Sequence, residues 1–386
     1  MAKKIGILTL NGYFNYGNRL QNYAVEQLLK SLGFKVKTII NDTSSKRTTD
    51  KSPLEKISTL REIDKKKMIK AMKSRAKYYL HKKQIDDYKN KKRKLFKKFS
   101  ADYLNETDYS ISKNDIPTDF SDRFDYFVTG SDQVWNPYYV RKHSSINFLT
   151  FAPKEKRIAF SPSFGVSEIP LEDKKNFKKW ISEMNMLSVR EYEGAKIIKD
   201  LTGREAEVLV DPTMVLKRKK WLSLSKEDSQ KPDNDFLMTY ILGELSREKK
   251  KQIRNFAEKN DLEIVDLAVK KGWSDYIAGP REFIDYINSA STIFTDSFHG
   301  TIFSILFKTP FVTFRRKGSH SMISRINTLF SKFDMKDRLE NNISLQRDEI
   351  MKIDFSHTDK ILEKERKKAY NYLENSFKSD EKHNAI

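Results

Sequence analysis

Short apolar runs alternate with amphipathic stretches from the first residues of the chain onward. Lys4 to Leu10 is typical of a buried strand, and Arg19 to Leu32 carries apolar residues at helical spacing before Gly33. Phe34 to Ile40 again has the composition of a strand. The pattern predicts a βαβ unit of Rossmann type, whose first loop, residues 11–18, lies at the sheet edge where ligands bind.

The same rhythm continues in two halves. In the first half it predicts strands at 124–129, 157–161, 187–191 and 207–210, with helices at 171–184 and 192–201. In the second half it predicts strands at 236–242, 263–269, 292–295 and 311–314, with helices at 248–259, 280–289 and 301–308. The polar stretch Trp221 to Asp235 is taken as the crossing between them. We therefore expect an α/β protein with two Rossmann-like domains and parallel sheets, at 1–220 and 221–345, followed by a helix and tail at 346–386.

The strongest chemical signal is the turn between the strand at 292–295 and the helix after it. Asp296 or Ser297 can cap this helix, and Gly300 allows the backbone to come close to a ligand. His299 therefore lies at or beside a helix N-terminus, where free N–H groups and a partial positive charge attract an anion. A lone histidine in a turn is often only a hydrogen-bonding residue. A catalytic or ligand-binding role is nevertheless favoured for His299, because it is one of only six histidines and lies at the sheet edge where ligands bind.

Other polar groups follow strands of the first half. Small or charged residues stand at strand ends, namely Gly130, Ser131 and Asp132, then Ser161 and Ser163, then Arg190. Because the carboxyl ends of parallel strands share one edge, these residues should gather there. Gly12 and Gly17 do not form the G-x-G-x-x-G fingerprint, so a dinucleotide is not indicated, and both glycines could simply shape the turn.

Composition adds two points. The 386 residues include no cysteine, which excludes thiolate metal sites and disulfides, and no apolar run reaches the length of a signal peptide or a membrane span. We expect a soluble, cytoplasmic protein. The net charge of +21 is concentrated, since Lys51 to Lys98 holds 19 basic and 5 acidic residues.

This basic stretch, 51–99, shows an amphipathic helical pattern and is interpreted as a helical insert in the first domain. Its lysines either form a solvated face or attach the protein to the inner face of an anionic membrane. Nucleic acid is less favoured, because the aromatic residues fall on the apolar face. A charged helix at His357 to Phe377 is expected to pack back across the molecule.

Five motifs in order resemble one family, the polysaccharide pyruvyl transferases. They are Asn15-Tyr-Gly-Asn-Arg-Leu-Gln-Asn-Tyr-Ala24, Thr129-Gly-Ser-Asp-Gln-Val-Trp135, Leu187-Ser-Val-Arg-Glu191, Asp211-Pro-Thr213 and Asp296-Ser-Phe-His-Gly-Thr301 with Pro310. The resemblance implies a GT-B-like fold with the site between the domains. It also implies a transferase of surface polysaccharide (exopolysaccharide) biosynthesis that moves a pyruvyl group from phosphoenolpyruvate onto a sugar as a ketal. Phosphoenolpyruvate would be the co-substrate, with no other cofactor and no metal, and the acceptor would be a lipid-linked or nucleotide-linked saccharide.

The resemblance also assigns roles to residues. His299 matches the motif histidine and would transfer a proton, and Arg190 matches a family arginine that would bind the anionic donor. Arg315, Arg316 and Arg325 are further candidates for the carboxylate and phosphate. The other predicted substrate contacts are Ser297, Gly300, Asn15, Gly17, Asn18, Gln21, Gly130, Ser131 and Asp132.

The chain departs from the family at one position. Many members carry an arginine two residues before the motif histidine, where this chain has Ser297. One anion contact that the resemblance implies is therefore missing, and two explanations stay open: a neighbour such as Arg315 supplies it, or the chain uses a different donor. Two alternatives stay open: a GT-B glycosyltransferase that uses a nucleotide sugar, and a catalytically inactive, membrane-associated assembly protein of the same fold.

Overall fold

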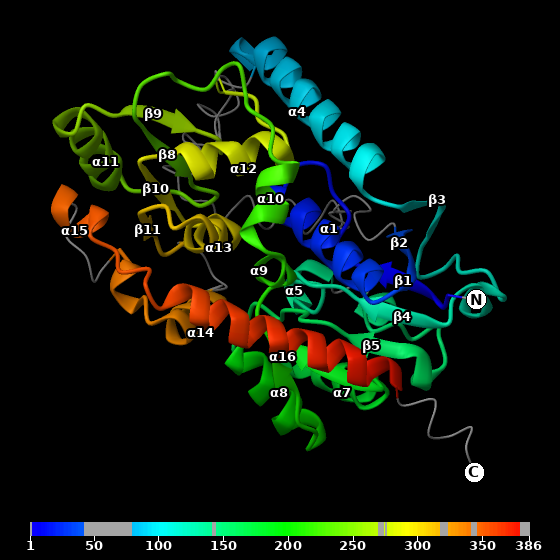
Figure 1. Cartoon of the computed structure of the whole chain (residues 1–386). Coiled ribbons are helices and arrows are strands. Elements are labelled where there is room, and N and C mark those ends of the chain that lie inside the picture. The colour runs from blue at the N-terminus through cyan, green and yellow to red at the C-terminus, as the bar shows by residue number, and fades with distance from the viewer. Residues whose placement is uncertain are drawn as a thin grey trace, which may run out of the picture.

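The computed structural model describes residues 2–41, 79–140, 144–268, 274, 276–316, 323–340 and 346–378. Two parallel sheets form the centres of two α/β halves (Figure 1). The described strands of the first sheet have the order β3-β2-β1-β4-β5-β6-β7, and those of the second the order β11-β10-β8-β9. Both are doubly wound sheets of the Rossmann kind, as the alternation of apolar and amphipathic stretches predicts.

The first sheet and its helices span the first half of the chain. Its strands are β1 (Lys4–Leu8), β2 (Lys35–Asn41), β3 (Glu106–Ile111), β4 (Tyr126–Thr129), β5 (Arg157–Ala159), β6 (Met186–Val189) and β7 (Glu207–Val208). Its helices are α1 (Tyr16–Ser31), α4 (Lys82–Tyr103), α5 (Pro137–Val140), α6 (Ser144–Asn147), α7 (Leu171–Ser182), α8 (Tyr192–Thr202), α9 (Pro212–Val215) and α10 (Arg218–Leu224). Strand β4 is buried at every position because helices cover both faces of the sheet.

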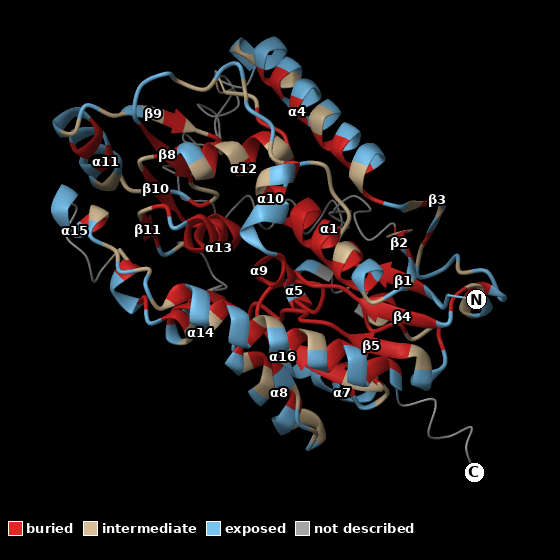
Figure 2. Cartoon of the chain, in the orientation of Figure 1, coloured by how far each residue is buried: buried red, intermediate tan, exposed pale blue. Residues whose placement is uncertain are grey.

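The second sheet is smaller. Its strands are β8 (Phe236–Tyr240), β9 (Glu263–Asp266), β10 (Thr292–Thr295) and β11 (Phe311–Thr313). Its helices are α11 (Arg247–Lys259), α12 (Pro280–Ser289), α13 (Phe298–Phe307), α14 (Ile323–Phe333) and α15 (Arg347–Met351). Helix α13 is buried along its whole length and lies between the second sheet and the first half of the molecule (Figure 2). This explains why its sequence, from Phe298 to Phe307, is apolar on all sides.

Two helices tie the halves together. Helix α4 contacts both α1 and α12, and the ammonium of its buried Lys92 donates a hydrogen bond to the Leu267 carbonyl beyond β9, at 3.3 Å. The basic insert predicted for the first domain is thus, in its described part, a connection to the second. Residues 42–78, which hold the first part of that insert, lie outside the described residues. Helix α16 (Thr358–Lys378) packs back across the molecule as expected, against α9 and α14.

Some local predictions were wrong. Trp221 was placed in a polar interdomain crossing, but it belongs to α10 and is fully buried in the core shared by both halves. The indole N–H of Trp221 donates to the Thr213 carbonyl at 2.9 Å, which satisfies its one polar group. The helix predicted at 301–308 begins earlier, at Phe298, because Ser297 caps it. Strand β3 had no clear apolar run and was not predicted.

Candidate active site

Three elements bring one polar group each to the junction of the two halves. Arg190 follows β6, Asp211 follows β7 and caps α9, and His299 lies in the first turn of α13. The carboxyl ends of β6 and β7 place Arg190 and Asp211 at the ligand edge of the first sheet, whereas His299 comes from the second half. All three side chains are buried. The site is therefore assembled only when the two halves meet.

Asp211 is the centre of this cluster. Its Oδ2 lies 2.7 Å from Nη2 of Arg190 and 3.4 Å from Nε2 of His299. Its Oδ1 accepts hydrogen bonds from the Thr213 amide at 2.9 Å and the Thr213 hydroxyl at 2.6 Å. Burial by itself would raise the pKa of Asp211, but Arg190 and His299 outweigh it and hold the pKa well below its usual range. Asp211 is thus a fixed anion that orients both partners.

Arg190 is only partly paired. Its Nη2 donates to the Ser131 hydroxyl and forms the ion pair with Asp211, but its Nε and Nη1 have no hydrogen-bond partner among the described residues. A buried guanidinium normally directs its N–H groups to acceptors, because an unsatisfied charged donor costs several kcal/mol in a low dielectric. Two unpaired donors beside a paired one therefore point to an anionic ligand.

A second buried arginine lies nearby. The guanidinium carbons of Arg190 and Arg325 are each 5.0 Å from the centre of the Phe298 ring. Burial, followed by repulsion from Arg190, lowers the pKa of Arg325 to about 10. The Nε of Arg325 also lacks a partner among the described residues, and its Nη1 is 3.9 Å from Asp132. Two like charges held this close favour a ligand of opposite charge between or beside them.

Next to this pair is a cavity of about 130 Å³, lined by Phe298, Arg315, Arg316 and Arg325 among others. Arg316 is already paired, since its Nε lies 3.1 Å from Oδ2 of Asp296. Arg315 is exposed at the rim. Three of the four predicted arginines thus line one cavity, and Arg325 has the unpaired donor. Arg325 therefore has a donor left for a ligand, whereas Arg316 supports the turn through Asp296.

Gly17 packs against the histidine ring. A Cβ atom at this position would lie 2.0 Å from Nδ1 of His299, so only glycine lets α1 approach the ring. Glycine is required at position 300 for a similar reason, because an added Cβ atom would lie 2.6 Å from the Thr295 hydroxyl oxygen. Both glycines therefore allow close packing around His299. Gly12 does not, because a Cβ atom added there would have no neighbour within 4 Å.

The other predicted contacts make hydrogen bonds within the protein. Asn15 caps α1, and Asn18 accepts from the Arg19 guanidinium. The Gln21 amide donates to the Thr9 hydroxyl at 2.8 Å. Ser297 caps α13 through the Gly300 amide at 3.3 Å, and Gly130 packs on Thr9. Direct contact of these residues with a substrate stays a prediction, whereas Ser131 belongs to the Arg190 and Asp211 cluster and Asp132 lies near Arg325.

Two residues of the cluster were not predicted. Asp211 stood in a motif without an assigned role, although an Asp-Pro pair directly after a predicted strand signals a polar group at the sheet edge. Phe298 gave no signal, because an aromatic residue beside a motif histidine does not reveal that two arginines lie against it. Within the described residues, no group of three or more histidine or acidic side chains is arranged to hold a metal ion, and no helix is long and apolar enough to cross a membrane.

The two Rossmann-like domains, with the candidate site where they meet, define the GT-B class of fold. A model of the polysaccharide pyruvyl transferase family matches residues 15–318, so the chain belongs to this family of transferases. The motifs quoted from the sequence fall almost entirely inside this range.

Among solved structures, one neighbour supports this fold and two others are less similar to the chain. One neighbour is a protein assigned as a UDP-N-acetylglucosamine 2-epimerase from Listeria monocytogenes, with 11% identity, a TM-score of 0.50, and coverage of 100% of this chain and 98% of that one. Another is the UDP-GlcNAc 2-epimerase from Neisseria meningitidis, with 10% identity, a TM-score of 0.44, and coverage of 95% and 94%. A third is the glycosyltransferase SnogD from Streptomyces nogalater, with 12% identity, a TM-score of 0.39, and coverage of 97% and 95%. No curated protein matches the chain.

Proposed function

We propose that this protein transfers the pyruvyl group of phosphoenolpyruvate to two hydroxyls of a saccharide, which produces a cyclic ketal and inorganic phosphate. The family supports a transferase that acts on a saccharide. The observation that carries the finer proposal is the buried pair Arg190 and Arg325, whose N–H groups include three without a partner among the described residues and so suit an anion. Phosphoenolpyruvate carries a carboxylate and a phosphate, which suit two guanidinium groups.

The reaction is an addition followed by a substitution at the same carbon. The oxygen of one sugar hydroxyl bonds to C2 of phosphoenolpyruvate and loses its proton, while C3 gains a proton and becomes a methyl group. The oxygen of the second hydroxyl then bonds to C2, the C2–O bond to phosphate breaks, and phosphate leaves with the second proton. Each step requires a proton to be moved at a defined place, so a positioned general acid or base accelerates it.

His299 is the group that we assign to proton transfer. It is the histidine of the family motif, and Asp211 lies 3.4 Å from its Nε2 without the angle of a well-aligned hydrogen bond. The packing of Gly17 against the other side of the ring fixes its position. Arg190 and Arg325 would hold the donor, and their positive charges would stabilise the phosphate as it departs.

The test is a reaction of the purified chain with phosphoenolpyruvate and a lipid-linked or nucleotide-linked saccharide. We expect inorganic phosphate to be released only when both substrates are present, and the acceptor to gain the mass of one pyruvyl ketal. The variant His299→Ala should fold normally and lose roughly 10² to 10⁴ in rate. His81→Ala, which changes a histidine outside the cluster, is the matched control.

Two results would contradict this assignment. Release of a nucleoside diphosphate from a nucleotide sugar, without use of phosphoenolpyruvate, would instead identify a glycosyltransferase. Turnover of His299→Ala at the wild-type rate would remove the histidine from the mechanism. A thermal melt of each variant separates loss of activity from loss of fold.

A further inference from the structure

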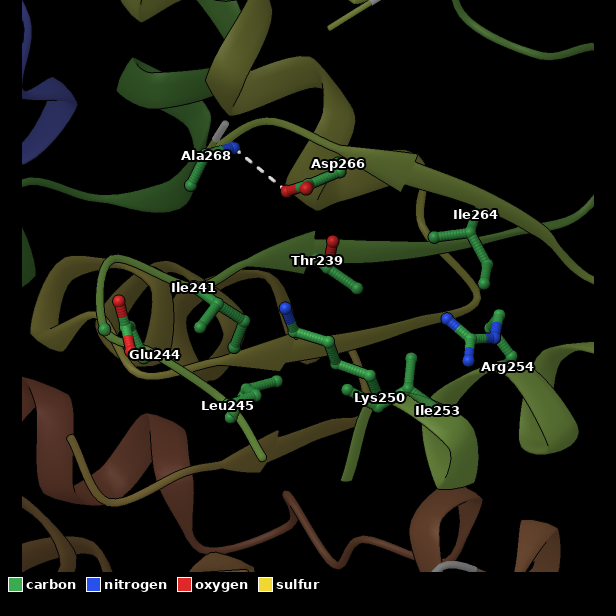
Figure 3. A pocket seen from close by; sticks show the side chains of 11 residues that line it. Thr239, Ile241, Glu244, Leu245, Lys250, Ile253, Arg254, Ile264, Asp266 and Ala268 are labelled. Atoms are coloured by element: carbon green, nitrogen blue, oxygen red, sulfur yellow. Dashed lines mark hydrogen bonds between the residues drawn. The ribbon is translucent and has the colours of Figure 1, made fainter. Parts of the chain in front are cut away.

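We propose that a second cavity, in the C-terminal domain, binds a nucleotide. The cavity measures about 350 Å³ and lies between β8, β9 and α11 (Figure 3). Its size is within the range of pockets for small ligands, which are mostly apolar and carry a few convergent polar groups. It lies on the face of the second sheet that α11 covers, and none of the residues assigned to proton transfer or donor binding lines it.

The apolar part of the cavity suits a flat ring. Side chains from the strands and from α11 form its walls, namely Ile241, Leu245, Ile253 and Ile264. Ile253 belongs to the buried core beneath α11, so this wall is held in place by packing. Branched aliphatic side chains on either side of a slot bury the faces of a nucleobase, and the hydrophobic effect contributes in proportion to the area covered.

The cationic part of the cavity suits a phosphate. Lys250 and Arg254 are one helical turn apart on α11 and both line the cavity. In Figure 3 the Lys250 side chain extends from α11 toward β8, and the Arg254 guanidinium lies toward Ile264. Neither residue forms a salt bridge with another residue in the part of the chain that the structure describes. An anion could therefore pair with Arg254 and with Lys250, whose charge also acts on Asp266 of the same cavity.

The acidic group suits a ribose. Asp266 is the last residue of β9, the second strand of the β8-α11-β9 unit, and it follows Gly243 by 23 residues. In Rossmann-type units an acidic residue at this place accepts hydrogen bonds from ribose hydroxyls. Asp266 is oriented by the Ala268 amide, which donates to its Oδ1 at 3.1 Å. Burial raises the pKa of Asp266, and hydrogen bonds from the Ala268 amide and Thr239, followed by the charges of Lys92 and Lys250, partly oppose this shift.

The loop between β8 and α11 lacks a G-x-G-x-x-G sequence, so it offers no backbone cradle for a pyrophosphate. A phosphate would be held by the side chains of Lys250 and Arg254 instead. These features together favour a mononucleotide rather than a dinucleotide. The inference concerns binding alone and holds whether or not the chain transfers pyruvate.

The cavity is connected to the candidate active site through the same loop. The backbone amides of Leu242 and Gly243 both donate to the Asp296 carboxylate, the former at 2.6 Å. Asp296 precedes the cap of α13, and Gly243 lines the cavity. A ligand that orders this loop therefore acts on a segment that also positions the first turn of α13.

Isothermal titration of the full chain with UMP and with AMP tests the proposal. We expect at least one of them to bind, and the corresponding nucleoside without phosphate to bind about tenfold more weakly or worse, as loss of a charge-assisted contact predicts. The double variant Lys250→Met/Arg254→Met should weaken nucleotide binding about tenfold or more. Asp266→Asn should weaken binding of the nucleotides and of ribose 5-phosphate alike, because both carry the ribose. Lys251→Met, an exposed lysine of α11 that does not line the cavity, should leave binding unchanged.

Several outcomes would overturn the proposal. They are an absence of binding by UMP and AMP at millimolar concentration, equal binding by ribose 5-phosphate and the nucleotides, or unchanged affinity in the double variant. Lys250 and Arg254 line the cavity where it is open to solvent, and both are exposed, so the double variant should keep its fold, which a thermal melt verifies. The variant His299→Ala should bind nucleotide normally. Failure of pyruvyl transfer and failure of nucleotide binding are therefore distinguishable.

Discussion

Arg19 and Arg190 are two buried arginines in the first domain, and their hydrogen bonds differ. Arg19, in the first turn of α1, donates through Nη1 to Glu106 at 2.7 Å, through Nη2 to the Leu10 carbonyl at 3.1 Å, and through Nε to Asn18 at 3.1 Å. Arg190, at the end of β6, leaves Nε and Nη1 without partners among the described residues. The first arginine is fully paired within the protein, whereas the second has two N–H groups without partners among the described residues, as the proposed anionic donor requires.

The difference shows how a structural arginine can be told from a functional one. Burial alone does not separate them, since both side chains are almost fully enclosed. The number of satisfied N–H groups does, because folding does not keep an unpaired buried donor without a compensating role. Both arginines occur in the motifs quoted from the sequence, but the resemblance to the family assigned a role only to Arg190.

The largest effect is expected at the structural arginine. Arg19→Met should lower the free energy of unfolding by about 3 to 5 kcal/mol, because it leaves Glu106 without its buried partner. Chemical denaturation measures this loss. The double variant Arg19→Met/Glu106→Gln should recover part of it. A single variant as stable as the wild type would mean that full pairing does not mark a structural arginine.

The next effect concerns the geometry of His299. Gly17→Ala places a Cβ where Nδ1 of His299 lies, so the ring must move, and a displacement of about 1 Å can cost roughly 10² in rate. The expected result is a fall in kcat with the fold retained, as alanine is favoured within a helix. Gly12→Ala, at a site with nothing within 4 Å, is the control. Equal rates for both variants would show that His299 need not stay in this position.

Arg190 provides the direct counterpart to Arg19. Arg190→Met should weaken donor binding by about 1.5 to 3 kcal/mol, seen as a higher KM for phosphoenolpyruvate. Arg190→Lys keeps a charge near Asp211 but loses the planar fork, so it should bind the donor more weakly than the wild type as well. Stability should change less than in Arg19→Met. An unchanged KM in both variants would assign Arg190 to structure.

Lys92 extends the comparison to a buried ammonium group. Its replacement should have the smallest effect, a change in how the free energy of unfolding depends on pH. Burial lowers its pKa to about 8, and Asp266 opposes this shift only in part. Between pH 8 and about 10.5 the unfolded chain holds a proton on Lys92 that the folded chain has lost, so this residue makes stability rise with pH by at most about 1.4 kcal/mol per unit. Lys92→Met should remove that rise. Urea melts at pH 7 and pH 9, compared between variant and wild type, measure it.

The sequence predicts much of the fold because most strands and helices are marked by periodic apolar residues. The strand at 292–295, for example, is found where it was expected, and the helix at 248–259 begins one residue earlier. The edge strand β3 was missed, since its half-exposed residues alternate only weakly. The polar ends of β4 and β6 could be assigned to one sheet edge from topology alone.

The sequence predicted less well which residues come together in the candidate site. The contact of Asp211 with His299 joins residues 88 positions apart and exists only because the two domains close on each other. No local pattern specifies how two sheets are oriented, since many side chains set that angle together. For the same reason the sequence could not show that Arg325 and Arg190 share the Phe298 ring, or that Arg316 is occupied by Asp296.

The return of α16 to the first domain has a consequence for synthesis on the ribosome. The Tyr372 hydroxyl donates to the Ala159 carbonyl of β5 at 2.7 Å, and the Phe377 ring lies 5.1 Å from that of Tyr126 on β4. The first sheet is thus translated long before the helix that covers one of its faces. Domains usually fold in the order in which they emerge, but here the earlier domain is completed by a later segment. Until α16 has been made, nascent chains carry an uncovered apolar face and are exposed to aggregation and to chaperones.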